Sequence, residues 1–430
     1  MPASSSAAFS HHDALRAALK QQDYAAAIPL IRAAIQADRR ALTDPVIKSW
    51  LALRWQNLFL QLAAKDKAAL KVARGVRGYL GDKREAMQVL AERFLLNASP
   101  ASWQPGLPPV ILPQKLNATL IFCPGFINGL LPVHAFEHEF EALEQQLGLR
   151  TFCADAHPVR SCEANVTDLL AAVEAGQGFR ALKGGASEPV NGPAPSDVVL
   201  MGYSKGSPDI LALLAQHPEL KDRIKAVYTW AGAIGGSHTA DGIYQLIADL
   251  PLDAAAQRLH DFLAMLMPGV TRKGTLRRLD EYDILGAVRS LTTTERAAFL
   301  TQHGAAIDAL NVPIFNVTGS TKLLEVPTFQ MLDYQKLSKF DPDNDMQVTQ
   351  AQAKLALPMS THVATLHGHH WDIAYPPFPR KMRMTTPNLD HPFPRKAGIM
   401  ANLLLAAELG LIGSDFESGL DSDSGSARQK

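Results

Sequence analysis

A strand-like run, a glycine-flanked serine and a helix-like run follow one another directly over residues 197–216. The apolar segment Val198–Met201 favours a strand. The next segment, Gly202-Tyr-Ser-Lys-Gly206, fits a sharp turn in which a side chain at either glycine would collide with neighbouring backbone. Pro208 stands where a first helical turn tolerates it. Such a turn raises Ser204 above a sheet edge, and the amides at the helix start favour negative charge there.

The pentapeptide alone also fits an ordinary strand-to-helix turn, so the rest of the chain must decide. A nucleophilic serine needs a base, and an acid that orients the base. The acidic loop 340–348 follows the predicted strand 312–318, and a run rich in histidine, 367–373, follows the predicted strand 361–366. The order serine, acid, histidine is therefore present, with each partner just past a strand.

Three segments resemble the active-site segments of serine esterases and lipases of the α/β-hydrolase superfamily. They are the turn at Ser204, Asn344-Asp-Met-Gln-Val348 and His370-Trp-Asp-Ile-Ala374. The resemblance implies Ser204 as nucleophile, His370 as base and Asp345 as the acid that orients it. It implies no metal and no organic cofactor.

The sequence offers alternative residues for both the acid and the base. Met346 stands where bacterial lipases often have glycine, which leaves Asp343 and Asp341 as substitutes for the acid. The adjacent His369 is the alternative base, although the family patterns align the histidine that follows it. The resemblance covers residues 115–412 as motifs at expected positions.

A further loop agrees with the resemblance. The strand-like run Ala118–Cys123 is followed by Pro124-Gly-Phe-Ile-Asn-Gly129. In this superfamily the loop after the third strand and the residue after the nucleophile supply the oxyanion-hole amides. By position these are the backbone N–H groups of Phe126 and Lys205. The side chain of Lys205 is expected to be solvated on the first turn of a helix.

The histidines also permit a metal site, since imidazole and carboxylate groups are common zinc ligands. His367, His369 and His370 lie close to Asp372 in the sequence. Trp371, however, stands where the pattern of metallo-β-lactamase-like enzymes needs an aspartate. One histidine acting as a base is the simpler interpretation.

The amino-acid composition limits which kinds of molecule the protein is expected to bind. The chain has 430 residues, of which 47% are hydrophobic and 20% charged, as in soluble globular proteins. Its 42 basic residues balance 42 acidic ones, so no basic face for nucleic acid or an acidic membrane is expected. The three cysteines offer no disulfide framework, and Cys123 and Cys153 are predicted to be buried. No signal-like segment and no apolar run of about 18–20 residues appears, which predicts a cytoplasmic protein.

The N-terminal part predicts helices. We expect disorder over 1–12 and a helical N-terminal extension over 13–98, with no identified partner. Residues 22–28 resemble the turn of a tetratricopeptide-type unit, but no repeat follows and Pro29 should disturb the second helix. The segment 99–109, rich in proline and glycine, marks a boundary.

Residues 110–412 predict an α/β-hydrolase domain, with a mostly parallel sheet and helices on both faces. The segment 176–195 is predicted to be a surface loop because it is rich in glycine and proline. Expected strands are 116–123, 150–154, 197–203, 224–230, 312–318 and 361–366. Expected helices lie near 134–147, 161–175, 208–216 and 396–410.

An insertion at about 239–310 exceeds a simple crossover and predicts a helical cap, as is common in this superfamily. Its large apolar residues either line an acyl pocket or hold the cap on the sheet. These residues are Phe262, Leu263, Met265, Leu266 and Met267. The serine- and aspartate-rich segment 413–430 predicts a disordered tail.

Together these features predict a serine hydrolase that cleaves a carboxylic ester with an apolar acyl part through an acyl-enzyme intermediate. The substrate would be a small or lipid-like ester, and contact with a membrane surface stays open. A thioesterase or acyltransferase on the same triad is the alternative within enzymes. A non-catalytic binding protein of the same fold is the alternative outside them.

Overall fold

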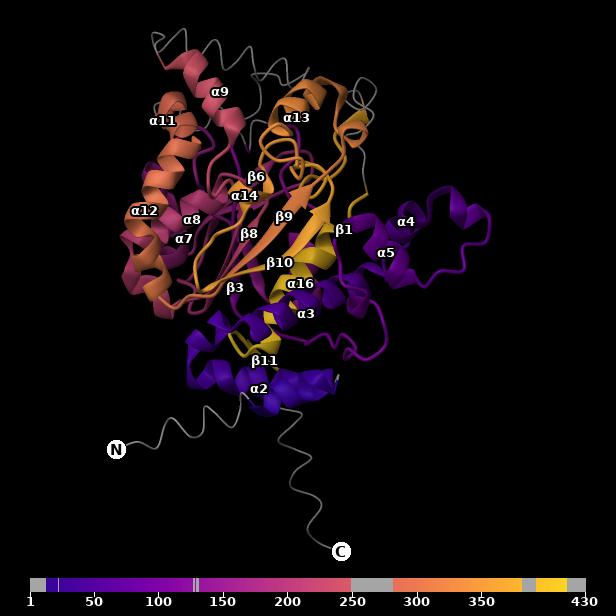
Figure 1. Cartoon of the computed structure of the whole chain (residues 1–430). Coiled ribbons are helices and arrows are strands. Elements are labelled where there is room, and N and C mark those ends of the chain that lie inside the picture. The colour runs from indigo at the N-terminus through magenta and orange to yellow at the C-terminus, as the bar shows by residue number, and fades with distance from the viewer. Residues whose placement is uncertain are drawn as a thin grey trace, which may run out of the picture.

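The structure is a computed structural model that describes residues 13–21, 23–126, 128, 131–248, 281–380 and 392–415. Its centre is a nine-stranded sheet with the strand order β1-β10-β9-β8-β7-β3-β4-β5-β6 (Figure 1). The strands are β1 (Leu95–Leu96), β3 (Thr119–Cys123), β4 (Arg150–Cys153), β5 (Gln177–Ala181), β6 (Ser187–Asn191), β7 (Val198–Tyr203), β8 (Ile224–Trp230), β9 (Ile314–Ser320) and β10 (Ser360–His367).

The strands from β10 to β4 pair in parallel, whereas β1, β5 and β6 pair antiparallel at the two edges. Every residue of β3, β7 and β9 is buried, because helices cover both faces of the sheet. The predicted α/β fold class, with a mostly parallel sheet, is confirmed.

Alternate residues of β7 enter different cores. Val198 and Leu200 pack with α7 (Cys162–Ala175), α8 (Gly206–Gln216) and α12 (Thr293–Ala309). Val199 and Met201 pack on the opposite face with α3 (Pro45–Ala63), α6 (Phe140–Leu147) and α16 (Arg395–Glu408). The period of two in the strand thus joins two helical layers to one sheet.

The N-terminal helices share the core of the sheet. Buried Trp55 in α3 donates from Nε1 to Asn402 Oδ1 of α16 at 2.7 Å, and β1 pairs with β10. Helix α2 (Tyr24–Ala37) runs through Pro29, so the expected disturbance there was wrong. Helices α4 (Lys67–Tyr79) and α5 (Ala86–Phe94) complete this part. The boundary between the N-terminal helices and the α/β domain stays a prediction, although the two parts pack against each other.

The segment 176–195 is a hairpin of β5 and β6 at the sheet edge, so its assignment as a loop was wrong. Sterics require glycine at position 178 of this hairpin, because a Cβ there would lie 2.2 Å from the carbonyl oxygen of Cys153 on the neighbouring strand. Pro189 is tolerated because β6 is the outermost strand.

The insertion contributes α9 (His238–Ile247), α11 (Ile284–Arg289) and α12, while residues 249–280 lie outside the described residues. All five apolar cap residues named above fall in that gap. Helices α9 and α13 (Met331–Leu337) stand above the carboxyl ends of the strands (Figure 1). Short α14 (Gln350–Ala353) lies between β9 and β10 in sequence.

Two short strands close the fold at its base. Strand β11 (Gly413–Ser414) pairs with β2 (Leu116–Asn117), inside the segment that the sequence assigns to the tail. None of the described helices is long and apolar enough to cross a membrane.

Candidate active site

Ser204 occupies a strained turn between β7 and α8. Its φ is 52°, in the left-handed region that residues with a side chain rarely adopt. A Cβ on Gly206 would lie 2.0 Å from Cys123 O, and one on Gly202 would lie 2.7 Å from Gly206 backbone, as the sequence predicted. The Ser204 amide donates to Trp230 O at 3.1 Å, which ties the turn to β8.

His370 and Asp345 form a buried pair. His370 Nδ1 lies 2.7 Å from Asp345 Oδ2. The other carboxylate oxygen, Oδ1, accepts from the amides of Gln347 at 3.0 Å and Val348 at 2.7 Å. A carboxylate held in this way keeps the proton on Nδ1, so Nε2 is the nitrogen that can accept one.

The alternative acids lie elsewhere. Asp343 is exposed, and its amide donates to Asp341 Oδ1 at 2.9 Å within the same loop. Met346 has a φ of 75°, and its amide donates to Asn344 Oδ1 at 3.0 Å. The turn after Asp345 therefore keeps a glycine-like backbone conformation with a methionine in place.

The two other histidines of the run each have their own carboxylate. His369 is fully buried, with Nε2 2.9 Å from Asp372 Oδ1 and Nδ1 accepting from backbone amides. His367 Nε2 lies 2.8 Å from Glu325 Oε2. Burial alone would raise the pKa of Glu325, but the hydrogen bond and charge of His367, the charge of Arg93 and the Lys322 backbone hydrogen bond together lower that pKa to about 2.

Each of the three histidines pairs with a different carboxylate, so their side chains do not converge on one point. Over the residues that the structure describes, no group of three or more His, Cys, Asp or Glu side chains could hold a metal ion. The arrangement suits one histidine in acid–base chemistry more than a shared metal.

Tyr203 connects the turn at Ser204 to the histidine loop, and the sequence analysis missed it. Its hydroxyl donates to His370 O at 2.8 Å, and the two rings lie 5.0 Å apart. The His370 amide donates to Asp345 O at 2.8 Å. The residue before Ser204 thus touches the same histidine that Asp345 orients.

The loop after β3 lies against the turn. A Cβ on Gly125 would lie 3.0 Å from Ser204 Cβ, so the glycine lets the loop come close. Phe126 follows directly and is half-buried, packed against the apolar cluster beneath α9. The structure therefore brings the loop of Phe126, Ser204 and the start of α8 to one place.

The Lys205 side chain is buried, so the prediction of a solvated lysine was wrong. Its Nζ lies 2.7 Å from Asp209 Oδ1 and 3.0 Å from Oδ2, and Asn165 Nδ2 donates to the same carboxylate at 3.0 Å. Burial alone would lower the pKa of Lys205, but the charge and hydrogen bond of Asp209, together with Cys162 and Cys123, outweigh burial and raise that pKa. Burying this side chain holds the residue next to Ser204 in one position.

No protein-family model and no curated protein sequence matches the chain. Among solved structures, a metagenomic carboxyl esterase superposes with a TM-score of 0.55 at 20% sequence identity, over 83% of this chain and 90% of that one. The mature lipase of Bacillus licheniformis superposes with a TM-score of 0.41 at 19% identity, over 61% of this chain and 89% of that one.

The likeness to the carboxyl esterase concerns the fold, because the identity is low. It is consistent with the mostly parallel nine-stranded sheet described above. The chain therefore has an α/β-hydrolase fold, which it shares with this carboxyl esterase.

Proposed function

We propose that the protein is a serine hydrolase that cleaves carboxylic esters. The observation that carries the proposal is the buried His370–Asp345 pair, joined at 2.7 Å and contacted by Tyr203 beside the strained Ser204. Strain at a non-glycine residue persists only where the surrounding structure maintains it, and it gathers at functional sites. The likeness to a carboxyl esterase supports the fold on which this chemistry commonly occurs.

In the proposed first step, Ser204 Oγ attacks the ester carbonyl carbon while His370 Nε2 accepts the hydroxyl proton. The carbonyl oxygen becomes an oxyanion that the N–H groups of Phe126 and Lys205 stabilise. The intermediate collapses when the carbon–oxygen bond to the alcohol breaks, and His370 returns the proton to the leaving alkoxide. An acyl-enzyme on Ser204 remains.

In the second step, water attacks the acyl-enzyme carbonyl and His370 accepts its proton. Collapse of the second intermediate releases the acid and returns the proton to Ser204 Oγ. Asp345 keeps its charge throughout, holds the imidazole tautomer and stabilises the imidazolium. The two amides that bind Asp345 Oδ1 hold the carboxylate in its orientation toward His370.

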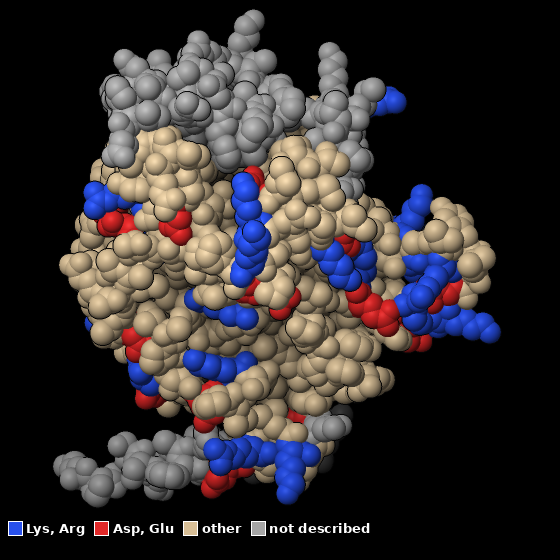
Figure 2. Space-filling model, turned by 45° about the horizontal axis from the view of Figure 1, so that its top comes forward, with Lys and Arg blue, Asp and Glu red and all other residues tan. Residues whose placement is uncertain are grey.

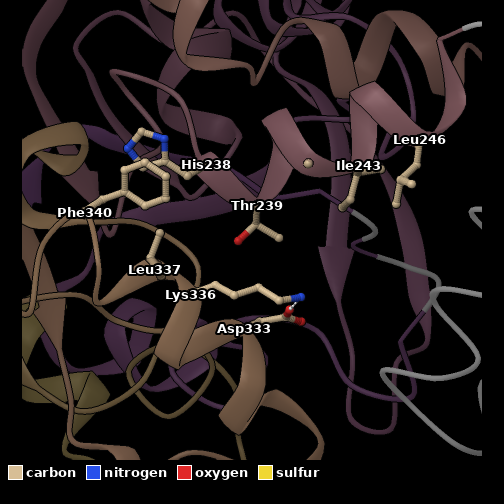
Figure 3. A pocket seen from close by; sticks show the side chains of 9 residues that line it. His238, Thr239, Ile243, Leu246, Asp333, Lys336, Leu337 and Phe340 are labelled. Atoms are coloured by element: carbon tan, nitrogen blue, oxygen red, sulfur yellow. Dashed lines mark hydrogen bonds and ion pairs between the residues drawn. The ribbon is translucent and has the colours of Figure 1, made fainter.

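The described part of the cap offers a pocket for an apolar group. A pocket of about 170 Å³ lies between α9 and α13, and its apolar lining includes Ile243, Leu246, Leu337 and Phe340 (Figure 3). Ile243 and Phe126 both pack against one apolar cluster, which supports a pocket on the same side as the proposed oxyanion loop. We propose that it receives the apolar part of the ester.

The test is steady-state hydrolysis of a series of p-nitrophenyl esters of increasing acyl length. We expect Ser204→Ala to lower kcat/KM by ~10⁴-fold or more, since the nucleophile is lost. Ser49→Ala, at an exposed serine in α3, serves as the matched control and should not change the rate. Product analysis with added alcohols and thiols shows whether water is the acceptor. Full activity of the Ser204→Ala protein would refute the proposal.

A further inference from the structure

Helices α4 and α5 form an arm that projects from the side of the molecule next to β1 (Figure 1). We define the arm as residues 65–94. Helix α4 breaks at Gly75, where φ is 51°, and the chain turns back at Gly81, where φ is 78°. No atom lies within 4 Å of a Cβ built at either glycine, so the tip between them stands in open space.

Large apolar side chains cover this tip and contact little of the protein. Val76, Tyr79 and Leu80 are 76%, 81% and 80% exposed, among the most exposed large apolar residues of the described chain. A folded protein gains nothing from displaying three such groups together in water. Their clustering at one projecting turn indicates a surface that enters an apolar medium.

Basic side chains surround the same tip. Lys71, Arg77 and Lys83 are exposed, and none of them forms an ion pair within the described residues. Lys65 and Lys67 extend the charge along the arm, and Figure 2 shows Lys and Arg side chains gathered on it. From the zero net charge of the whole chain we expected no basic face. That total does not exclude a local excess of basic residues such as the one on the arm.

Three of the four acidic residues of the arm bind other groups of the arm, whereas the fourth, Glu85, is exposed near Lys83. Asp66 accepts the amides of Ala68 and Ala69 at the start of α4. Asp82 and Glu92 both pair with Arg84, and the hydrogen bonds from Arg84 lower the pKa of Asp82 to about 2. Residues 65–94 contain eight basic and four acidic residues, so the arm keeps a formal net charge of +4.

We propose that the arm docks the protein on an anionic lipid bilayer. Val76 and Leu80 would enter the boundary between headgroups and acyl chains, Tyr79 would lie at the headgroup level, and Lys71, Arg77 and Lys83 would contact anionic headgroups. A basic amphipathic segment with an apolar tip has the composition that binds membrane surfaces. Nucleic acid would use the positive charge but leave Val76 and Leu80 unexplained. This surface is separate from Ser204, so the inference is independent of the proposed chemistry.

The test is cosedimentation of the full chain with phosphatidylcholine vesicles, with and without phosphatidylglycerol. We expect binding that requires phosphatidylglycerol and weakens as salt rises. Reversing three charges together (Lys71→Glu, Arg77→Glu and Lys83→Glu) should weaken binding by at least about a hundredfold, because each lost basic residue contributes about fivefold and each new carboxylate repels the anionic surface. Replacing the tip (Val76→Ser, Tyr79→Ser and Leu80→Ser) should weaken it by about tenfold or more.

Matched controls separate the arm from general properties of the surface. Leu324→Ser with Leu332→Ser removes apolar groups that are 80% and 70% exposed elsewhere, and should leave binding unchanged. Charge reversal at Lys115, Lys221 and Lys354, also exposed, should weaken it far less. Circular dichroism checks that each variant folds. The proposal is overturned if vesicles do not bind, if the controls weaken binding equally, or if only DNA competes and the tip variant binds normally.

Discussion

Two neighbouring histidines, His369 and His370, are both buried and both paired with an aspartate, yet their surroundings differ. His370 reaches Asp345 in another loop through Nδ1, at 2.7 Å. His369 reaches Asp372 three residues ahead through Nε2, at 2.9 Å, while its Nδ1 accepts amides of the same turn. The first pair joins two segments of the site, and the second pair shapes one turn.

The different use of the two ring nitrogens indicates which histidine suits the role of a base. His369 uses both ring nitrogens inside its own turn, and Asp372 O in turn accepts from the buried Arg395 at 2.9 Å. His370 uses only Nδ1 for its aspartate, and its ring lies against Tyr203 beside Ser204. We therefore propose that His369 holds the loop and that His370 takes part in the chemistry.

The largest expected effect separates the two histidines. His370→Gln should lower kcat/KM for a p-nitrophenyl ester by ~10⁴-fold, because the proposed base is lost, with little change in unfolding. His369→Gln should lower the free energy of unfolding by ~1–3 kcal/mol, because its buried hydrogen bonds are lost. Activity assays on folded protein and urea unfolding measure both. Equal losses of activity would contradict the assignment.

The two aspartates should divide in the same way. Asp345→Asn should lower kcat by ~10³–10⁴-fold, since the amide no longer fixes the tautomer of His370. Asp372→Asn should mainly lower the free energy of unfolding, by ~1–3 kcal/mol. Asp343→Asn, at the exposed carboxylate of the same loop as Asp345, is the control and should change neither quantity. A large loss of activity in that control would reopen the choice of acid.

The third pair, His367 with Glu325, should appear in the pH dependence of stability. The folded-state pKa of Glu325 is about 2, below its ordinary value of 4.5. Its ionised form therefore stabilises the fold above pH 4.5, and this contribution is lost as pH falls toward 2. Glu325→Gln should lower stability at neutral pH and make the fall over that window shallower, as followed by thermal unfolding. An unchanged profile would show that the pair contributes nothing.

The smallest effect concerns the backbone after Asp345. Both Met346→Ala and Met346→Gly remove a buried side chain, so both should destabilise the fold. Because φ at this position is 75°, the glycine variant should be the more stable of the two by ~1 kcal/mol. Urea unfolding of the two proteins measures the difference. An alanine variant as stable as the glycine variant would contradict the strain inferred here.

Much of the fold could be predicted from the sequence because the central strands are continuous apolar runs. The hairpin of β5 and β6 could not, since glycine and proline are typical of loops, and the need for Gly178 arises only from Cys153 on the neighbouring strand. The turn at Ser204 was predictable because its glycines follow from local sterics. Its partners Asp345 and His370 were predicted with alternatives still open, because only the tertiary structure shows which aspartate pairs with which histidine.

The burial of Lys205 shows the same limit. A lysine and an aspartate four residues apart in a helix interact whether they face water or the interior, and only the packing of α7 against α8 decides. The exposure of Tyr79 was not predictable either. It follows from the break of the helix at Gly75, and the sequence alone does not show that this break lies in open space.

The most direct test of the central claim is labelling with a fluorophosphonate probe, with the modified peptide mapped by mass spectrometry. The account predicts rapid labelling of Ser204 alone, lost in Ser204→Ala, strongly slowed in His370→Gln and nearly normal in folded His369→Gln. Absence of labelling in the folded wild-type protein, or labelling that depends on His369 instead of His370, would contradict it.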